Sequence, residues 1–382
     1  MHQVLIVAAE ASSALYAQRL IEYWKSEKKP VKAFGVGTQE MEILGFERIG
    51  KAEEMAVFGL VEVIEKYSHL KVVFNNLVQA AKERRPDVVI IMDYPDFNLM
   101  LAKEMHALGI PVVYYITPQL WAWRKGRVKK IQKYCSEVFV LFPFEVEFFE
   151  KNGVKARFVG HPLLDEIQDK YFDPHYRKMR RQQFGIQDSD IVIGLMPGSR
   201  RSEVSQHMQI QLQVARQFLK NYKNIKILMI VAPTFTKEQI QDYMGDIQFP
   251  LIMVKDEPFE MINLADYILA ASGTATLIVG LLHKPMVIMY RLKFLTGLIA
   301  RIVVRGVKFF GIVNLIHGRE IVPERWQGGA NPQSLYELMK RYIDDPAYAE
   351  AVRNDLRQLQ KSLGNKGATV RVAHAIEEGY FK

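Results

Sequence analysis

The chain has 382 residues, 49% of them hydrophobic, and its 51 basic and 42 acidic residues give a net charge of +9. This length exceeds one typical hydrophobic core and predicts two domains, while the composition excludes a disordered chain. The single cysteine, Cys135, excludes a disulfide scaffold.

The bulk properties also indicate what the protein binds and where it works. The positive charge favours an anionic partner, and because no recognition motif accompanies it we expect a nucleotide or a phospholipid surface and no nucleic acid. Nine histidines without metal-ligand spacing predict no metal site. The chain enters an apolar strand at once and contains no run long enough to span a bilayer, so we expect a cytoplasmic protein.

Short apolar strands alternate with longer helical stretches through the first half of the chain. The expected strands are 3–8, 31–36, 87–92, 112–116, 137–141 and 156–159, and the expected helices are 14–26, 59–84, 99–108, 124–134 and 143–152. This alternation predicts a parallel sheet with helices on both faces. Residues 165–184 are polar and basic with a broken pattern, which indicates a linker.

The alternation restarts after the expected linker. The expected strands are 191–195, 226–231, 251–254, 267–270 and 286–289, and the expected helices are 203–220, 236–244, 258–264 and 274–282, with further charged helical sequence from residue 346. We therefore predict an α/β protein with two Rossmann-like domains facing a cleft, over residues 1–170 and 185–345. Ligands in such sheets bind outside the carboxyl ends of the strands.

A phosphate-binding turn is expected where the first strand of the second domain ends. Pro197 and Gly198 end the apolar run, and Ser199 and Arg200 come just before a polar helix. A helix N-terminus offers unpaired backbone N–H groups, and an arginine adds a donor fork suited to phosphate. The alternative is an ordinary strand–turn–helix with exposed arginines.

A second turn of this kind follows the strand at 267–270. Ser272, Gly273 and Thr274 are small residues placed directly before a helix, which suits a phosphate or another ligand that approaches the backbone closely. The alternative is a simple helix cap.

Two carboxylates, Asp93 and Asp96, follow the strand at 87–92. The carboxyl end of a strand is where an α/β fold places a catalytic base. The alternative is that Asp96 caps a helix over 97–108, and the spacing alone favours that alternative.

Three stretches carry more apolar or aromatic residues than one buried face needs. Trp121 and Trp123 follow a strand end and could stack on a sugar, or fill the core. Residues 55–77, which include Met55 and Phe58, could line an acyl-chain groove, or form ordinary core. Residues 291–312 interleave basic and apolar residues without an acidic one, which is typical of a segment that binds an anionic membrane, or of a packed helix followed by a strand.

Seven short segments share their order and spacing with one known family. They are residues 94–98, 118–124, 143–145, 159–162, 197–200, 272–277 and 285–287. On these segments the chain resembles the lipid A disaccharide synthases, a family of glycosyltransferases, over nearly its whole length. The resemblance implies a GT-B fold in which C-terminal helices, residues 346–382, cross back to the first domain.

The same resemblance implies an inverting, metal-independent reaction that needs no cofactor. A 2,3-diacylglucosamine unit would pass from UDP to a lipid X-like acceptor, 2,3-diacylglucosamine 1-phosphate, with release of UDP. The enzyme would be peripheral on the cytoplasmic surface of the inner membrane and would serve lipopolysaccharide assembly. The resemblance leaves the acyl-chain length and the oligomeric state open.

The family's site residues can be placed on this sequence. Asp96 corresponds to the base that deprotonates the acceptor 6-hydroxyl, with Glu10 as the next candidate. The positions implied for the donor are Ser199, Arg200, Ser272, Gly273, Thr274, Asn314 and Gln327. Those expected for the acceptor and its acyl chains are Ser12, Met55, Phe58 and Trp121.

The sequence also departs from the family pattern at two acidic positions. Ala14 stands where the first loop of the family carries an aspartate, and Ile278 stands where GT-B enzymes commonly hold the nucleotide ribose with an acid. Two alternatives follow. The chain could be a divergent or inactive paralogue that binds acylated glucosamine at the membrane surface, or another UDP-sugar enzyme such as a 2-epimerase.

Overall fold

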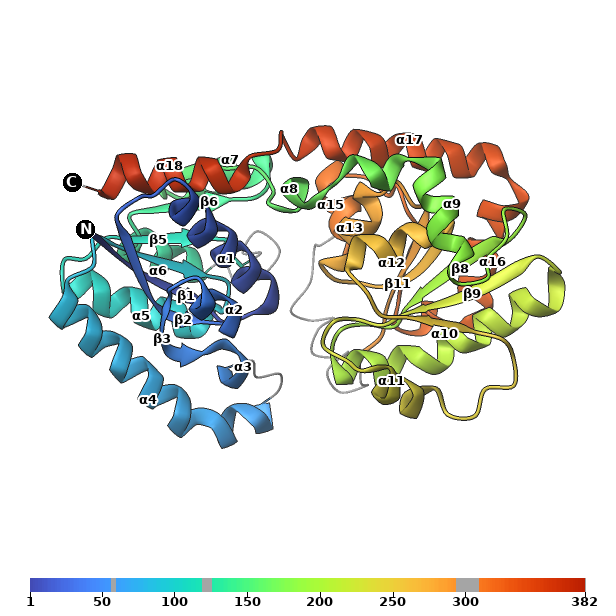
Figure 1. Cartoon of the computed structure of the whole chain (residues 1–382), viewed down its shortest axis with the longest axis horizontal. Coiled ribbons are helices and arrows are strands. Elements are labelled where there is room, and N and C mark those ends of the chain that lie inside the picture. Colours follow the sequence, from blue (N-terminus) through green and yellow to red (C-terminus); the bar gives the residue numbers. More distant parts are fainter. Residues whose placement is uncertain (56–59, 119–125, 293–308, 382) are drawn as a thin grey trace. The chain divides into compact units, whose positions relative to one another are not determined.

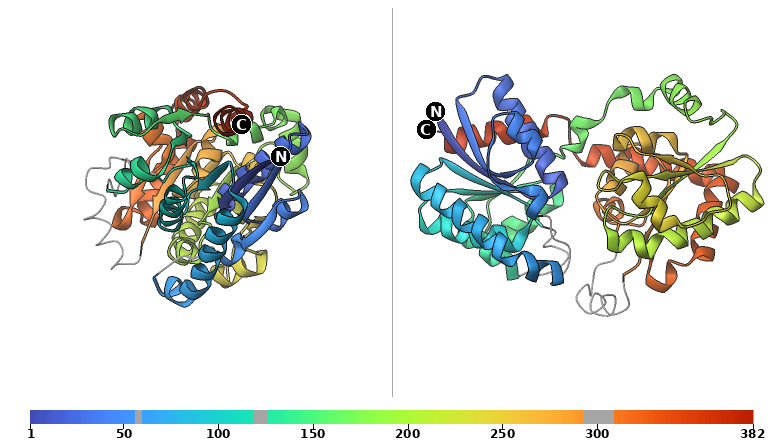
Figure 2. Two further views of the ribbon diagram at one scale, coloured as in Figure 1. Left: turned by 90° about the vertical axis from the view of Figure 1, so that its left-hand side faces the viewer. Right: turned by 60° about the horizontal axis from the view of Figure 1, so that its bottom comes forward.

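The computed structural model describes residues 1–55, 60–118, 126–292 and 309–381. The chain divides into a first unit, Met1–Asp165 with Leu363–Lys382, and a second unit, Glu166–Ser362 (Figure 1). Each unit is a parallel sheet with helices on both faces, which confirms the predicted α/β class. Figure 2 shows each sheet from two further directions.

The first unit contains a seven-stranded sheet in the order β3-β2-β1-β4-β5-β6-β7. The strands are β1 His2–Ala8, β2 Val31–Gly37, β3 Glu47–Lys51, β4 Val88–Met92, β5 Val112–Tyr115, β6 Glu137–Val140 and β7 Ala156–Phe158. The helices are α1 Ala11–Ser26, α2 Gln39–Ile43, α3 Ala52–Met55, α4 Leu60–Arg84, α5 Pro95–Ala107, α6 Gly126–Tyr134, α7 Pro143–Lys151 and α18 Ala368–Tyr380, with α8 Leu163–Glu166 at the boundary.

The central strands of the first unit are apolar throughout because helices cover both of their faces. Every residue of β4 is buried, as expected for a parallel strand that no face exposes to water. One core cluster joins the sheet to α4, α5 and α6, and α18 packs against α1. The C-terminal helix is held there by Glu377, which accepts from Trp24 Nε1 at 3.1 Å and from Lys29 Nζ at 2.8 Å.

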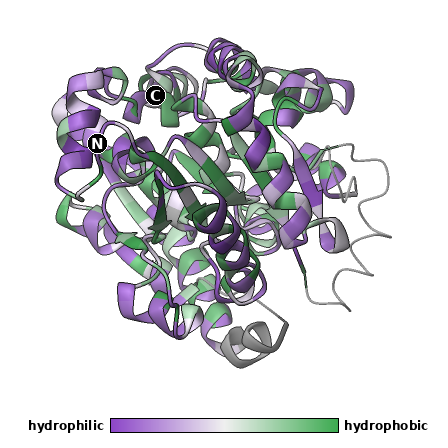
Figure 3. Ribbon diagram, turned by 90° about the vertical axis from the view of Figure 1, so that its right-hand side faces the viewer, coloured by the Kyte–Doolittle hydropathy of each residue, from purple (hydrophilic) through white to green (hydrophobic). Residues whose placement is uncertain are grey.

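The second unit contains a six-stranded sheet in the order β10-β9-β8-β11-β12-β13. The strands are β8 Ile191–Met196, β9 Ile225–Ile230, β10 Ile252–Val254, β11 Tyr267–Ala271, β12 Met286–Tyr290 and β13 Glu324–Trp326. The α-helices are α9 Pro174–Gln182, α10 Arg201–Asn221, α11 Lys237–Met244, α12 Pro258–Leu264, α13 Ala275–Leu281, α15 Ile312–His317, α16 Pro332–Asp344 and α17 Pro346–Ser362, and the 3-10 helices are η1 Asp169–Phe172 and η2 Gln327–Gly329. Figure 3 shows that the central strands are mostly hydrophobic, while the surrounding helices carry both hydrophilic and hydrophobic residues.

The prediction of a linker at residues 165–184 is wrong, because residues from Glu166 onward are part of the second unit. Helix α9 is anchored by Arg177 and Arg181, whose guanidinium groups lie 2.7 and 2.8 Å from the carboxylate oxygens of Asp266. Arg181 also donates to the carbonyl oxygen of Leu264. The polar, basic composition that indicated a linker is therefore the composition of a helix held by partly buried ion pairs.

The two C-terminal helices belong to different units, whereas the sequence analysis placed both with the first domain. Helix α17 packs against α13, α15 and α16 of the second unit, and only α18 joins the first unit. The charged segment at 291–312 lies mostly outside the described residues. Among the helices that the structure describes, none combines the length and the apolar character needed to cross a membrane.

Candidate active site

The carboxyl edge of the first sheet brings two of the predicted residues together. Strands β1 and β4 are neighbours, with Ala8 opposite Met92, so the segments that follow them emerge side by side. Glu10 follows β1 and the stretch from Asp93 to Asp96 follows β4. Burial raises the pKa of Tyr94, and the charge of Glu10 raises it further, which indicates that Glu10 lies close to this stretch.

The backbone at this edge takes an unusual conformation. Asp93 has φ 49°, Tyr94 has φ 41°, and Ile116, which follows the neighbouring strand β5, has φ 62°. The left-handed region costs about 1–3 kcal/mol for a residue with a side chain and persists where the surroundings enforce it. The Asp93 N–H donates to the Ile116 carbonyl oxygen at 3.1 Å, so the two strained segments hold each other.

Buried polar side chains support the turn from below. Asn98 is fully buried, and its Nδ2 donates to the carbonyl oxygens of Met92 at 3.0 Å and Asp93 at 2.8 Å. The Tyr114 hydroxyl donates to the same Asp93 oxygen at 2.7 Å, and burial holds the pKa of Tyr114 well above its usual range. The sequence analysis missed both residues as site residues, although Asn98 is part of the 94–98 segment that it singled out.

The predicted base lies in the first turn of α5. The side chain of Asp96 is 78% exposed, and its Oδ1 lies 2.6 Å from Nη2 of Arg127, whose own side chain is 12% exposed. The capping hypothesis for Asp96 is wrong, because α5 begins at Pro95 with Tyr94 in the N-cap position. A mostly buried arginine thus holds an accessible carboxylate in one place, and Arg127 is a further residue that the sequence did not reveal.

The first turn of α1 carries the other predicted polar residues of this edge. Ser12 is half-buried. The hydroxyl of Ser13 accepts from the Glu10 N–H at 3.2 Å and donates to the Glu10 carbonyl oxygen at 2.8 Å, which fixes the backbone where α1 begins. Ala14, the position of the missing family aspartate, is buried.

The structure describes one of the three residues predicted to contact the acyl chains. Met55 is fully buried in the core cluster of the first unit, and its carbonyl oxygen accepts from the Tyr94 hydroxyl at 3.1 Å. Its surroundings agree with the alternative of ordinary core. Phe58 and Trp121 lie outside the described residues.

The second unit presents its own turn at the carboxyl end of β8. Gly198 has φ 131°, and a Cβ there would lie 2.6 Å from the Cβ of Glu203, so the turn requires glycine. Helix α10 begins at Arg201 with Arg200 as its N-cap. Glu203 accepts from the Ser199 N–H at 3.1 Å and from Nη1 of Arg200 at 3.3 Å, while the Arg200 side chain stays 47% exposed.

Two buried side chains one turn apart on α10 support this loop. The Nδ1 of His207 lies 2.8 Å from the Pro197 carbonyl oxygen, and its Nε2 accepts from the Arg291 N–H at 2.9 Å. These partners assign the proton to Nδ1, and burial lowers the pKa of His207. The Nε2 of Gln211 donates to the carbonyl oxygens of Met196 and Leu269, both at 3.2 Å. The sequence analysis missed this pair, because a polar residue at a core position of a helix is visible only in three dimensions.

The second predicted turn lies beside the first one. Strands β8 and β11 are neighbours, and Ser272, Gly273 and Thr274 connect β11 to α13. The Ser272 N–H donates to the Met289 carbonyl oxygen at 3.0 Å. Apart from its own chain neighbours, no atom of the described residues lies within 4 Å of where a Cβ of Gly273 would be, which leaves space beside the backbone of this turn. Ile278, further along α13, is 9% exposed and packs as core.

Asn314 and Gln327 have different surroundings. The Oδ1 of Asn314 accepts from the N–H groups of Ile321 at 2.7 Å and Val322 at 3.0 Å, and its Nδ2 donates to Val322 and Glu324. An amide can make no more hydrogen bonds than these, so Asn314 organises residues 321–324. Gln327 is half-buried directly after β13 with φ 50°.

Within the described residues, no group of three or more His, Cys, Asp or Glu side chains is placed to hold a metal ion. Both edges instead offer what transfer to a sugar hydroxyl needs. The first unit holds a carboxylate at a defined position, and the second unit holds an arginine beside a helix N-terminus that suits a phosphate group.

Known proteins with related sequences support this chemistry. The lipid-A-disaccharide synthetase family matches residues 4–376 of the chain. The lipid-A-disaccharide synthase of Anaeromyxobacter dehalogenans is 37% identical over 375 residues, which are 98% of this chain and 96% of that protein. The enzyme of the same name from Geobacter sulfurreducens is 36% identical over 377 residues, 99% of this chain and 97% of that protein.

Solved structures with little sequence similarity share the fold. The UDP-GlcNAc 2-epimerase of Neisseria meningitidis has a TM-score of 0.61 at 14% identity, covering 99% of both chains. The calicheamicin glycosyltransferase has a TM-score of 0.59 at 14% identity, covering 99% of this chain and 98% of that one. These likenesses confirm the predicted GT-B fold, and the family match with the close relatives decides the identity. The chain belongs to the lipid-A-disaccharide synthetase family of glycosyltransferases.

Proposed function

We propose that the chain transfers 2,3-diacylglucosamine from UDP to 2,3-diacylglucosamine 1-phosphate and releases UDP. The observation that carries this proposal is the exposed Asp96 carboxylate, which Arg127 holds 2.6 Å away at the carboxyl edge of the first sheet. A carboxylate in that position can accept a proton from a bound hydroxyl group. The names of the close relatives supply the substrate class.

In the proposed reaction Asp96 takes the proton of the acceptor 6-hydroxyl. The acceptor oxygen attacks C1 of the donor sugar from the face opposite the diphosphate, the bond from C1 to the diphosphate oxygen breaks, and UDP leaves with both electrons of that bond. One displacement of this kind inverts the configuration at C1. Glu10, which lies close to Tyr94 on the same edge, is the group next in line to act as base.

Arg200 and the two turns of the second unit would hold the donor diphosphate. Negative charge grows on the leaving phosphate oxygens as the bond to C1 breaks. The half-exposed Arg200 guanidinium and the N–H groups at the start of α10 suit that charge. Ser272 to Thr274 would approach the same phosphates from the neighbouring strand, since β11 lies beside β8. Gln327 would lie near the donor, and Asn314 would act by positioning residues 321–324.

The direct test is UDP release from the purified chain with both acylated substrates. We expect release only when donor and acceptor are present together. The product should carry one new β-1,6 bond. Interconversion of the donor with its 2-epimer, or binding of both substrates without any UDP release, would contradict the proposed reaction.

We also propose that the chain works at the surface of an anionic membrane. Both substrates would carry acyl chains, and residues 291–312 combine basic with apolar residues, a composition that favours an anionic bilayer. Sedimentation with vesicles that contain anionic lipid should decrease at high salt and in the double variant Arg301→Glu, Arg305→Glu. Binding that ignores salt and both substitutions would contradict this role of the segment.

A further inference from the structure

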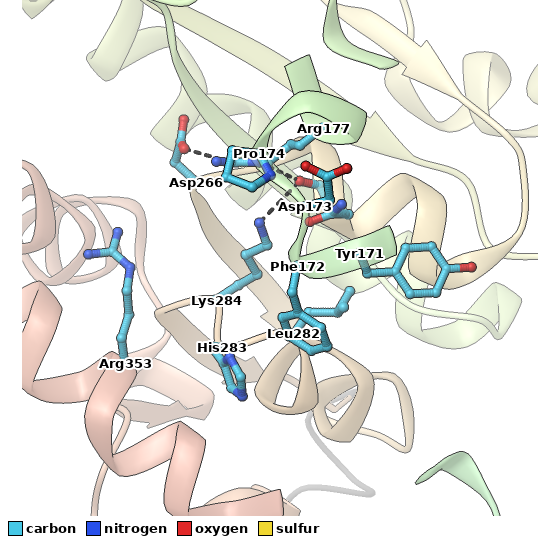
Figure 4. A pocket seen from close by; sticks show the side chains of 11 residues that line it. Tyr171, Phe172, Asp173, Pro174, Arg177, Asp266, Leu282, His283, Lys284 and Arg353 are labelled. Atoms are coloured by element: carbon cyan, nitrogen blue, oxygen red, sulfur yellow. Dashed lines mark hydrogen bonds and ion pairs between the residues drawn. The ribbon is translucent and has the colours of Figure 1, made fainter. Parts of the chain in front are cut away.

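The second unit contains a cavity of about 240 Å³ that is separate from both turns described above. The cavity lies next to the start of α9, the end of α12, the segments that lead into β11 and β12, and α17 (Figure 4). Its polar lining residues are Asp173 before α9, Asn263 of α12, Asp266 before β11, His283 and Lys284 before β12, and Arg353 of α17. Asp266 precedes β11 and Lys284 precedes β12. The cavity therefore lies at the amino edge of the sheet, opposite the diphosphate turns.

The charges around this cavity do not balance. The Asp266 carboxylate already accepts from Arg177 at 2.7 Å, from Arg181 at 2.8 Å and from the Val192 N–H at 2.8 Å. Two arginines thus already share the negative charge of Asp266, and Lys284 is a third positive charge nearby. Asp173, the other acidic residue of the lining, is exposed and caps α9 by accepting from the His175 N–H.

Lys284 is the most poorly paired group of the cavity. Its side chain is buried and its Nζ makes one hydrogen bond, at 3.1 Å, to the Asn263 carbonyl oxygen. Nε of Arg177 donates to the same oxygen at 2.8 Å. An ammonium group has three N–H donors, so Lys284 is left without a counter-ion of its own among the described residues. Figure 4 shows its side chain directed toward the Arg177–Asp266 pair.

Two further lining residues have capacity for a ligand. The buried Nε2 of His283 has no hydrogen-bond partner in the part of the chain that the structure describes. Arg353 forms an ion pair with the exposed Glu350, at 3.3 Å, and its guanidinium carbon lies 5.8 Å from the centre of the Tyr267 ring. The ring of Phe172 is 43% exposed and lies 5.1 Å from the His283 ring, so an apolar wall borders the charged groups.

We propose that this cavity binds a phosphate group, either free phosphate or the phosphate of a small monoester. Lys284 and Arg353 would donate to its oxygens, and His283 would supply a further polar contact. Charged donors prefer anionic oxygens to a carbonyl. The volume exceeds the roughly 30 Å³ share of one liquid water molecule several-fold, which leaves room for a tetrahedral anion. Burial and the neighbouring arginines lower the pKa of Lys284, and a bound anion would offset both effects.

The test is calorimetric titration of the full chain with inorganic phosphate and, separately, with glucosamine 1-phosphate. Lys284→Met should weaken phosphate binding at least tenfold, as expected for the loss of a charged hydrogen bond. Arg353→Gln should weaken it by a smaller factor, because this arginine is partly exposed and already paired. Tighter binding of glucosamine 1-phosphate that is lost in Lys284→Met would identify a sugar phosphate as the natural source, and equal binding of the two probes would identify free phosphate.

Two control variants separate this cavity from the diphosphate turns. Lys220→Met removes an exposed lysine of α10 and should leave phosphate binding unchanged. Arg200→Ala should abolish any phosphate binding at the diphosphate turns and leave the binding that depends on Lys284 in place. Lys284→Met should fold at least as well as the wild type without phosphate, because it removes a poorly paired buried charge. Absence of phosphate binding to the wild type, or binding that survives Lys284→Met and is lost in Arg200→Ala, would overturn the proposal.

Discussion

The carboxyl edges of the two sheets differ in which residues adopt a positive φ. At the first edge Asp93, Tyr94 and Ile116 accept a left-handed conformation although each carries a side chain. In the turn after β8 at the second edge the residue with positive φ is Gly198, which has none, whereas Gln327 after β13 carries a side chain at φ 50°. The first edge is proposed to place a carboxylate, and the strain there is about 1–3 kcal/mol per residue. The turn after β8 is proposed to bring backbone N–H groups to a phosphate, and it needs glycine because a Cβ on Gly198 would lie 2.6 Å from the Cβ of Glu203.

The two edges are supported in the same way, by buried polar side chains that bind backbone carbonyl oxygens. The first turn is held by Asn98 and Tyr114, which both bind the Asp93 carbonyl oxygen. The second is held by His207 and Gln211, which bind the carbonyl oxygens of Pro197 and Met196. In both units buried polar side chains fix the backbone, while the group proposed to meet the substrate stays accessible. The variants below test whether the two edges have separate tasks.

The largest effect is expected at the first edge, from Asp96→Asn. The amide cannot take a proton, so turnover should fall about 10²–10⁴-fold. The side chain is mostly exposed and asparagine can still accept from Arg127, so the melting temperature and UDP binding should not change. Steady-state UDP release, thermal unfolding and UDP titration measure the three quantities. Normal turnover in this variant would move the base elsewhere, with Glu10 next.

The second edge should respond in donor affinity. Arg200→Ala removes a charged donor worth about 1.5–3 kcal/mol, which corresponds to an increase of roughly tenfold or more in the donor KM. The neighbouring Arg201→Ala is a matched control, because Arg201 is exposed at the first helical position. Equal donor KM values in the two variants would remove Arg200 from the donor site.

A smaller effect is expected from the support of the second edge. His207→Ala leaves the Pro197 carbonyl and the Arg291 N–H without their partner, at a cost of about 1–3 kcal/mol. Both the melting temperature and the affinity for UDP should decrease, and His207→Gln should recover part of each because it keeps a donor and an acceptor. A decrease in melting temperature with unchanged UDP affinity would show that His207 serves stability alone.

The last prediction concerns the pH dependence of stability, to which His161, a buried histidine of the first unit, should contribute. Burial lowers the pKa of His161 from 6.5 to about 3. Between these two pH values His161 is protonated in the unfolded chain and neutral in the folded chain. His161 therefore destabilises the fold progressively as the pH falls from 6.5 toward 3, by at most about 1.4 kcal/mol per pH unit. His161→Asn cannot titrate, and its unfolding free energy should vary less with pH. Parallel pH curves for the two proteins would contradict this.

Much of the architecture could be predicted because it rests on local patterns. The apolar runs at β1, β4, β8 and β11 were found within one or two residues, since strands buried on both faces are apolar along their whole length. The short elements α15 and β13 and the 13-residue helix α16 were not predicted. Strand β13 has three residues, all half-buried at the edge of its sheet, and so has no apolar run of its own.

The features of the candidate site also separate into those that local sequence predicts and those that only the tertiary structure shows. The sequence by itself determined the fold class and the two turns with Asp96, Ser199 and Arg200, because residue type, order along the chain and strand ends are local properties. The tertiary structure alone decided that Arg127 holds Asp96, that Asn98 and Tyr114 meet at one oxygen, and that α9 is a packed helix. The Arg127–Asp96 and Tyr114–Asp93 contacts join residues 31 and 21 positions apart. Such pairings depend on which strands are neighbours and on how deeply the charge is buried, and neither is visible in the order of residues.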